Sequence, residues 1–158
     1  MLVVFNFKNQ MSIKQQLELL EKFNQPINKQ HQLIIAPIIP NYDEYHFDIA
    51  VQNLSIKGRN VGDLSPKHLK HYNINYAFVG HLERQKCLNE TTRIIRSKLD
   101  NALQKDIVPI ICVGNHENPI FECATYLDGL NLQDKHIIIA YEILSATLKG
   151  KKDYSFTK

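Results

Sequence analysis

Several residue types are scarce in this chain, and each scarcity argues against a class of protein. The 158 residues include no tryptophan, 6 glycines, no Gly-Gly pair and 3 cysteines. Cys87, Cys112 and Cys123 are odd in number and lack paired metal-ligand spacing, which argues against a disulfide framework or a cysteine-rich zinc site. We expect buried, reduced thiols and neither metal nor cofactor. The alternative, a reactive cysteine, lacks an evident histidine partner in the sequence.

Long apolar runs and charge of one sign are also missing. No apolar run approaches the ~18 residues that a membrane span needs. The first residues form a strand-like run without a basic leader, so we expect a cytoplasmic protein. The net charge of +3 comes from 19 basic and 16 acidic residues that are scattered along the chain, which gives no support to a nucleic-acid partner. The composition is that of a soluble globular protein, and the length predicts one domain over residues 1–158.

Apolar runs of strand length alternate with helical patterns along the chain. Ser12 and Gln15 form a capping box before a helix that Pro26 is expected to end. Pro109 interrupts the fifth run and is expected to weaken that strand. Continuous apolar runs without hairpin signals predict a parallel sheet, although spacing alone does not distinguish an open sheet from a barrel. The predicted strands are 2–7, 32–36, 48–52, 76–80, 107–113 and 136–141, and the helices begin near Ser12, Ser65, Thr91 and Pro119.

Three of these strands run directly into a polar residue suited to one reaction. The residues are Lys8, His81 and Glu142. Active sites of parallel barrels lie at the carboxyl ends of the strands, where a cation, an electrophile and a base would meet. Each residue also has a simpler interpretation: Lys8 as a solvated lysine, His81 as a helix cap, and Glu142 as the partner of a surface lysine.

Local motifs around these positions resemble those of the triosephosphate isomerase family. Asn6-Phe7-Lys8 is similar to the family's Asn-Trp-Lys opening. Val79-Gly80-His81-Leu82-Glu83-Arg84 resembles its Gly-His-Ser-Glu-Arg motif, and Ala140-Tyr141-Glu142 its Ala-Tyr-Glu motif. Cys112-Val113-Gly114 resembles its Cys-Ile-Gly. The order and approximate spacing of these segments agree from residue 2 to about residue 151.

The resemblance implies an α/β fold, an incomplete (β/α)8 TIM barrel of about six parallel strands with intervening helices. It implies a cofactor-free isomerase of glycolysis and gluconeogenesis that interconverts dihydroxyacetone phosphate and glyceraldehyde 3-phosphate through an enediolate. Glu142 would move the substrate proton, and His81 would polarise the carbonyl. Lys8 would face the substrate and its phosphate beside Asn6, which would also line the site. Glu83 would hold Lys8 or its neighbours in place.

The chain also departs from the family, and the departures leave a second interpretation open. A complete barrel has eight strands and typically ~250 residues, so residues 1–158 are interpreted as a single truncated domain. The family's Gly-rich phosphate loops follow strands seven and eight and have no counterpart here. Its Pro-Val-Trp lid segment is Ile143-Leu144-Ser145. We therefore expect low activity, with a catalytically impaired or inactive remnant, at most a binding or assembly module, as the alternative. Open edge strands predict a homodimer or other self-association.

Overall fold

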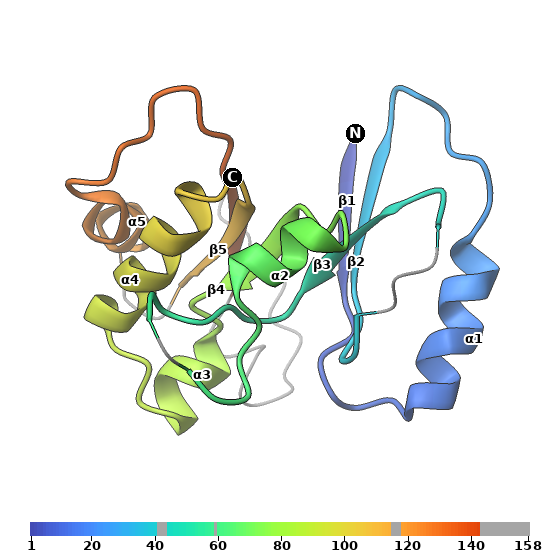
Figure 1. The fold of residues 1–158 in the computed structure, drawn as a ribbon, viewed down its shortest axis with the longest axis horizontal. Coiled ribbons are helices and arrows are strands. Elements are labelled where there is room, and N and C mark those ends of the chain that lie inside the picture. The colour runs from blue at the N-terminus through green and yellow to red at the C-terminus, as the bar shows by residue number, and fades with distance from the viewer. Residues whose placement is uncertain (41–43, 59, 115–117, 143–158) are drawn as a thin grey trace.

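The fold is a curled sheet of parallel strands with helices in the connections (Figure 1). The computed structural model describes residues 1–40, 44–58, 60–114 and 118–142, so the altered lid segment lies outside the described residues. Six strands pair in sequence order and in parallel throughout. The strands are β1 (Leu2–Asn6), β2 (Gln32–Ala36), β3 (Asp48–Val51), β4 (Tyr76–Val79), β5 (Val108–Val113) and β6 (Ile138–Tyr141). The helices are α1 (Ile13–Phe23), α2 (Pro66–His71), α3 (Leu82–Cys87), α4 (Thr92–Leu103) and α5 (Pro119–Leu127). This arrangement confirms the incomplete barrel.

Side-chain caps begin the helices where the sequence predicted them. Ser12 and Gln15 form the reciprocal capping box of α1, in which each side chain bonds the other residue's backbone N–H. Ser65, Thr91 and Asn118 cap α2, α4 and α5 without the reciprocal bond, each through a side-chain oxygen that accepts from backbone N–H groups of the first turn. Helix α1 ends at Phe23, before Pro26, because the Asn24 backbone already leaves the helical conformation. The helix thus ends shortly before the proline that was expected to end it.

Successive strand residues face two different cores. On the outer face, residues such as Ile35, Ile49 and Ile111 pack with the helices. On the inner face a smaller cluster fills the concave side of the sheet, which is the interior of the unfinished barrel: Ile34, Ala36, Ala50, Phe78, Ile110 and Cys112. Because strand side chains alternate with a period of two and both faces are covered, the central strands are continuous apolar runs in the sequence.

Pro109 lies within β5, so the strand continues through the residue that was expected to weaken it. The Val108 N–H donates to the Asn75 carbonyl on the β4 side, at 2.8 Å. Successive residues of a strand point their N–H groups to opposite sides, so the position without a donor at Pro109 faces β6. Strand β6 pairs with β5 only from Ile110 onward. The missing donor therefore falls where the ladder has not yet begun.

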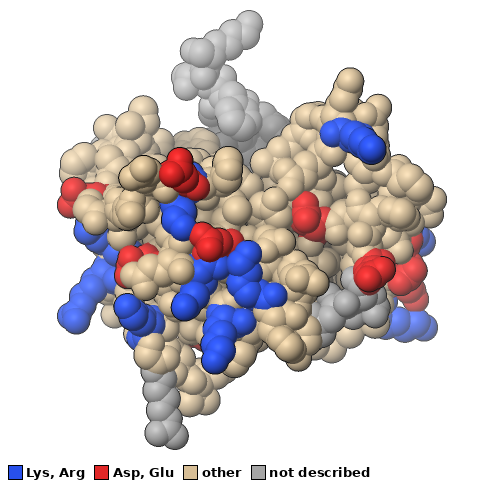
Figure 2. All heavy atoms as spheres, turned by 45° about the horizontal axis from the view of Figure 1, so that its top comes forward, with Lys and Arg blue, Asp and Glu red and all other residues tan. Residues whose placement is uncertain are grey.

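Among the described residues, the sheet is open along β1 and β6. In Figure 1 these two end strands, β1 and the orange-red β6, lie on either side of the middle of the view. No helix of the described residues combines the length and apolar character that a membrane crossing requires. On the face drawn in Figure 2, Lys and Arg side chains gather at the lower left with Asp and Glu side chains beside them. That patch therefore carries both signs of charge.

Candidate active site

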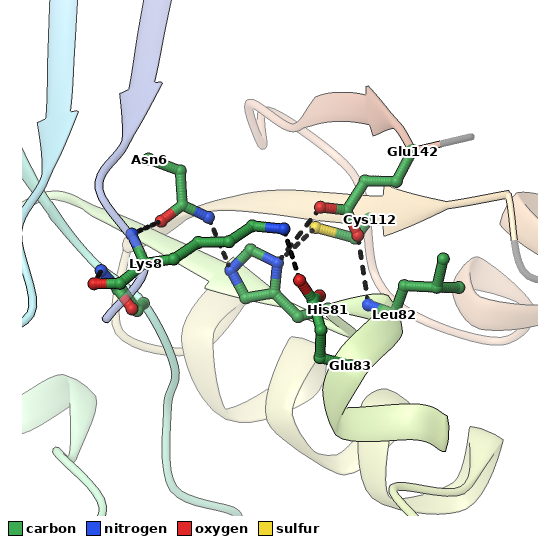
Figure 3. A network of polar contacts seen from close by, with 8 residues as sticks. Asn6, Lys8, His81, Leu82, Glu83, Cys112 and Glu142 are labelled. Atoms are coloured by element: carbon green, nitrogen blue, oxygen red, sulfur yellow. Dashed lines mark hydrogen bonds and ion pairs between the residues drawn. The ribbon is translucent and has the colours of Figure 1, made fainter. Parts of the chain in front are cut away.

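The carboxyl ends of β1, β4 and β6 bring the three predicted residues into one group (Figure 3). The Lys8 ammonium donates to Glu83, and the two side chains are equally half-buried. Nδ1 of His81 lies 3.4 Å from Oε1 of Glu142, and both side chains are largely buried. The side chains of Asn6, Lys8, His81, Glu83 and Glu142 therefore lie at the same end of the curled sheet, as the sequence predicted.

A tight turn after β1 orients Lys8 and Asn6 together. Lys8 has a φ of +48°, a conformation that few non-glycine residues adopt. Its backbone N–H donates to Oδ1 of Asn6 at 2.9 Å, which stabilises the turn. Because Oδ1 is engaged, the amide nitrogen of Asn6 is the group that faces Nε2 of His81, at 3.2 Å. Nε2 is therefore in position to accept from the Asn6 amide, and Nδ1 is the ring nitrogen that carries a hydrogen toward Glu142.

The Glu142 carboxylate is held in its ionised form. Burial by itself would raise its pKa, but the contact with His81 Nδ1–H, the Leu82 backbone N–H and the Lys8 cation together hold the pKa below its ordinary value. The Leu82 N–H donates to Oε2 at 3.1 Å. Glu142 is thus an ionised carboxylate near neutral pH, the form that a general base requires.

Cys112 completes the group and was not predicted. Its Sγ lies 3.4 Å from Nδ1 of His81, so the thiol has the histidine neighbour that the sequence did not reveal. Burial, reinforced by nearby Glu142, raises the pKa of this thiol well above its ordinary value. The alternation of β5 could have identified it, since Cys112 shares the inward face with Ile110. The expectation of buried thiols is wrong for Cys87, which is exposed.

Gly114 allows the end of β6 to approach the end of β5. It has a φ of +125°, and a Cβ at this position would overlap the Glu142 carbonyl oxygen. The backbone N–H of Glu142 donates to the Val113 carbonyl at 2.8 Å. A larger residue at 114 would therefore displace the backbone that carries the glutamate.

Two cavities meet at Lys8. One, of about 230 Å³, is lined by polar residues that include Gln52, Asn53, His81 and Arg84. The other, of about 390 Å³, lies between β1 and β6 inside the unfinished barrel and is lined by Glu142 and mainly apolar side chains. His81 lines the first cavity and Glu142 the second, and the Lys8 side chain borders both.

A buried charged network lies beyond the polar cavity and was also missed by sequence reasoning. Glu90 Oε2 accepts from Arg84 Nε at 2.6 Å and from Lys98 Nζ at 2.7 Å. Lys98 also donates to Oδ1 of Asn53 at 2.6 Å, which ties the network to the cavity lining. Burial lowers the pKa of Lys98, although its hydrogen bond to Glu90 opposes that effect. Asn53 and Arg84 are therefore fixed by this network rather than by the sheet alone.

The structure also decides between the simpler interpretations of single residues. Lys8 pairs with Glu83 rather than standing free in solvent. His81 occupies the N-cap position of α3, but its side chain makes no capping hydrogen bond. Glu142 contacts His81 and the Leu82 backbone, and no surface lysine among the described residues forms an ion pair with it. The described contacts of Lys8 and Glu142 therefore differ from the simpler interpretations, whereas His81 does stand at the N-cap position, without a capping hydrogen bond.

Comparisons with known proteins agree with the resemblance of the motifs. The family model described as "Triosephosphate isomerase" matches residues 1–152. A triosephosphate isomerase of Orientia tsutsugamushi (strain Ikeda) is 32% identical, with 89% of this chain aligned to 64% of the relative. The enzyme of Mycoplasma pneumoniae is 30% identical, with 94% of this chain aligned to 67% of the relative. The chain thus spans about two-thirds of the length of these relatives, and it belongs to the triosephosphate isomerase family.

Proposed function

We propose that this chain moves a proton between adjacent carbons of a phosphorylated triose, interconverting dihydroxyacetone phosphate and glyceraldehyde 3-phosphate. Glu142 is the base, and an N–H of the His81 ring polarises the carbonyl oxygen. Lys8 supplies the cation that stabilises the enediolate and attracts the phosphate, and Asn6 orients the histidine and lines the site. In this proposal the protein acts in glycolysis and gluconeogenesis in the cytoplasm. A glutamate base working with a neutral histidine is the established pairing for this isomerisation, and the groups present here match it.

The observation that supports the proposal most directly is the pairing of an ionised, largely buried glutamate with a histidine ring. The 3.4 Å separation between Glu142 Oε1 and His81 Nδ1 leaves both groups within reach of one small substrate. For the reaction, Glu142 must leave the Leu82 N–H and turn toward the substrate carbon. The carboxylate then loses its contacts with His81 Nδ1 and the Leu82 N–H and gains a contact with the acidic C–H group of the substrate.

Charge pairing favours weak substrate binding. Among the described residues that line the polar cavity, the cations are Lys8 and Arg84, and both are already paired, with Glu83 and Glu90. A substrate phosphate must compete with Glu83 for Lys8. We therefore expect a high KM for this chain.

The open sheet supports a second candidate, an impaired or inactive relative that serves as a binding or assembly module. The cavity beside Glu142 is bordered by both unpaired edge strands, with Leu2 and Val4 on one side and Ile138 on the other. A reacting centre that admits water loses much of its electrostatic stabilisation.

Hydrogen–deuterium exchange into the substrate tests the two candidates. Dihydroxyacetone phosphate is incubated in deuterated buffer with the purified chain, and carbon-bound deuterium is followed by NMR. This measurement detects proton transfer even where net turnover is slow. We expect Glu142→Gln to lower the exchange rate by about 10²–10⁴-fold, the usual contribution of a general base.

Glu18→Gln is the matched control, because Glu18 is an exposed glutamate of α1 whose ion pair with Lys14 is long, at 4.0 Å. This variant should exchange at the rate of the unaltered chain. Equal exchange by the unaltered chain and by Glu142→Gln would contradict the isomerase proposal and favour the non-catalytic candidate.

A further inference from the structure

Three metal-ligating atoms converge inside the candidate active site. Nδ1 of His81, Sγ of Cys112 and a carboxylate oxygen of Glu142 all lie within 4.8 Å of one another. Nitrogen, thiolate sulfur and carboxylate oxygen are the donors that zinc takes in proteins. We propose that these three residues form a binding site for a divalent borderline ion, Zn²⁺, with water as the fourth ligand.

The distances match the edges of a zinc coordination sphere. Tetrahedral zinc, with Zn–N and Zn–O bonds of about 2.0–2.1 Å and a Zn–S bond of about 2.3 Å, separates its ligand atoms by about 3.3–3.6 Å. Nδ1 of His81 lies 3.4 Å from Sγ of Cys112 and 3.4 Å from Oε1 of Glu142. Two of the three protein edges of the tetrahedron therefore exist already, before any ion enters.

Neighbouring groups hold the donors in place. The His81 ring stacks on Phe78 with ring centroids 4.7 Å apart. The second oxygen of Glu142 is bound by the Leu82 N–H, which leaves Oε1 directed at the histidine. A thiolate and a carboxylate together neutralise the double charge of the ion, and the nearby Lys8 cation is balanced by Glu83. The pocket is therefore preorganised and electrically balanced for a divalent cation.

Binding moves two protons. The Cys112 thiol loses its proton to the buffer as the sulfur–metal bond forms. The ring hydrogen of His81 leaves Nδ1, and a hydrogen is taken up at Nε2, so that the ring stays neutral. One proton is released in total for each ion bound.

With the metal bound, the Asn6 side chain would make an unfavourable contact with His81, and a substitution of Asn6 therefore tests the proposed site. A new hydrogen on Nε2 would face the amide nitrogen of Asn6, which is itself a donor. Aspartate at this position keeps one oxygen for the Lys8 N–H and offers the other to Nε2–H. A metal-bound histidine that donates to a carboxylate is the arrangement that strengthens zinc sites. Asn6→Asp should therefore tighten metal binding without altering a ligand.

A bound Zn²⁺ would be coordinated by Glu142 and His81, the proposed base and electrophile, so zinc should inhibit proton transfer. This consequence rests on the proposed isomerase function. Metal binding itself does not rest on it and is measured separately.

The test is titration of the metal-free purified chain with Co²⁺, a spectroscopic substitute for Zn²⁺. We expect one equivalent to give the visible bands of tetrahedral cobalt and a thiolate-to-cobalt charge-transfer band, and Zn²⁺ to displace both. Cys112→Ser should abolish the charge-transfer band. Cys87→Ser is the matched control, because Cys87 is exposed and lies outside the cluster, and it should keep the band.

Two further variants keep the proposal testable if Cys112→Ser does not fold. Glu142→Gln should weaken cobalt binding and Asn6→Asp should tighten it, each by about tenfold or more. A charge-transfer band retained in Cys112→Ser, or cobalt affinity unchanged in both Glu142→Gln and Asn6→Asp, would overturn the proposal. Cobalt binding as expected in a chain that exchanges no substrate deuterium would leave the metal site standing and reject the isomerase proposal alone.

Discussion

Lys98 is a buried cation whose neighbours depend on it. Its ammonium lies between Glu90 and Asn53, and both Lys98 and Glu90 are almost completely buried. Glu90 Oε1 is a buried oxygen without a hydrogen-bond partner among the described residues, so this carboxylate is already incompletely satisfied. The network therefore has little capacity to absorb the loss of a partner.

We predict that Lys98→Met lowers the free energy of unfolding by about 3–5 kcal/mol, because it leaves a buried carboxylate with one cation fewer. Urea unfolding followed by circular dichroism measures the change. Lys105→Met, at an exposed position just after the same helix, should change it by less than ~0.5 kcal/mol. Equal changes in the free energy of unfolding for the two substitutions would show that the buried pair of Lys98 and Glu90 contributes no stability.

A substitution at Gly114 would introduce both backbone strain and a steric overlap, whereas a substitution at Gly58 would introduce the strain alone. Both have positive φ, but a Cβ at Gly58 would meet nothing within 4 Å, whereas one at Gly114 would overlap the Glu142 carbonyl. We predict a cost of about 1 kcal/mol for Gly58→Ala. Gly114→Ala should cost about 3 kcal/mol or more, because strain and overlap add. Similar unfolding midpoints for the two variants would contradict the close approach of β5 and β6.

At the scale of single elements, α1 depends on its cap. Two apolar residues of this helix, Ile13 and Leu17, remain substantially exposed. Its tertiary packing is therefore incomplete. Ser12→Ala should cost about 0.5–2 kcal/mol, the usual range for a lost N-cap. Ser97→Ala within α4 is the control, since that serine caps no helix, and its unfolding midpoint should stay close to that of the unaltered chain.

A surface ion pair links the loops that lead into β5 and β6. Lys135 Nζ donates to Oδ1 of Asp106 at 2.6 Å, and this bond with its charge holds the pKa of Asp106 below its ordinary value. A depressed carboxyl pKa contributes stability that is present above the ordinary aspartate value near 3.9 and is lost as pH falls through the lower folded value.

The difference in unfolding free energy between the unaltered chain and Asp106→Asn isolates this contribution. We expect the difference to favour the unaltered chain at about pH 6 and to shrink toward zero as pH falls below about 4. The effect should be small, because Asp106 is exposed. A difference that grows as pH falls would contradict the assigned direction.

At the scale of the molecule, both open edges carry exposed apolar side chains. Leu2 and Phe5 are exposed on β1. At the other edge, Ile139 and Tyr141 of β6 border an apolar hollow of about 510 Å³ that reaches Ile120 of α5. In a closed barrel, further strands and helices cover such positions.

We predict that the purified chain, as a single incomplete domain of residues 1–158, self-associates through these edges. Unpaired strand ladders and apolar patches both favour association. Sedimentation velocity at several concentrations measures it, and Phe5→Lys with Ile139→Lys should reduce it by placing charges on both edges. A monodisperse monomer with a sharp, cooperative thermal transition would contradict this prediction.

Local signals along the chain were sufficient to predict the order and type of the elements, except for the short helix α3. Strand runs, caps and helical stripes each depend on residues within one or two turns of the chain. The polar residues at the strand ends could also be identified, since parallel strands bring their carboxyl ends to one edge. This is why Lys8, His81 and Glu142 could be placed together before the fold was known.

Contacts between individual groups, in contrast, emerged only from the folded sheet. The contacts of Cys112 and of Asn6 with the His81 ring join residues that are far apart in the chain. Such contacts depend on the curvature and stagger of the sheet, which no local pattern encodes. The tolerance of Pro109 has the same origin, because it depends on where β6 begins to pair with β5. Local propensity therefore determined where the strands and helices of this protein form. The packing of the sheet determined which side chains meet in the candidate active site.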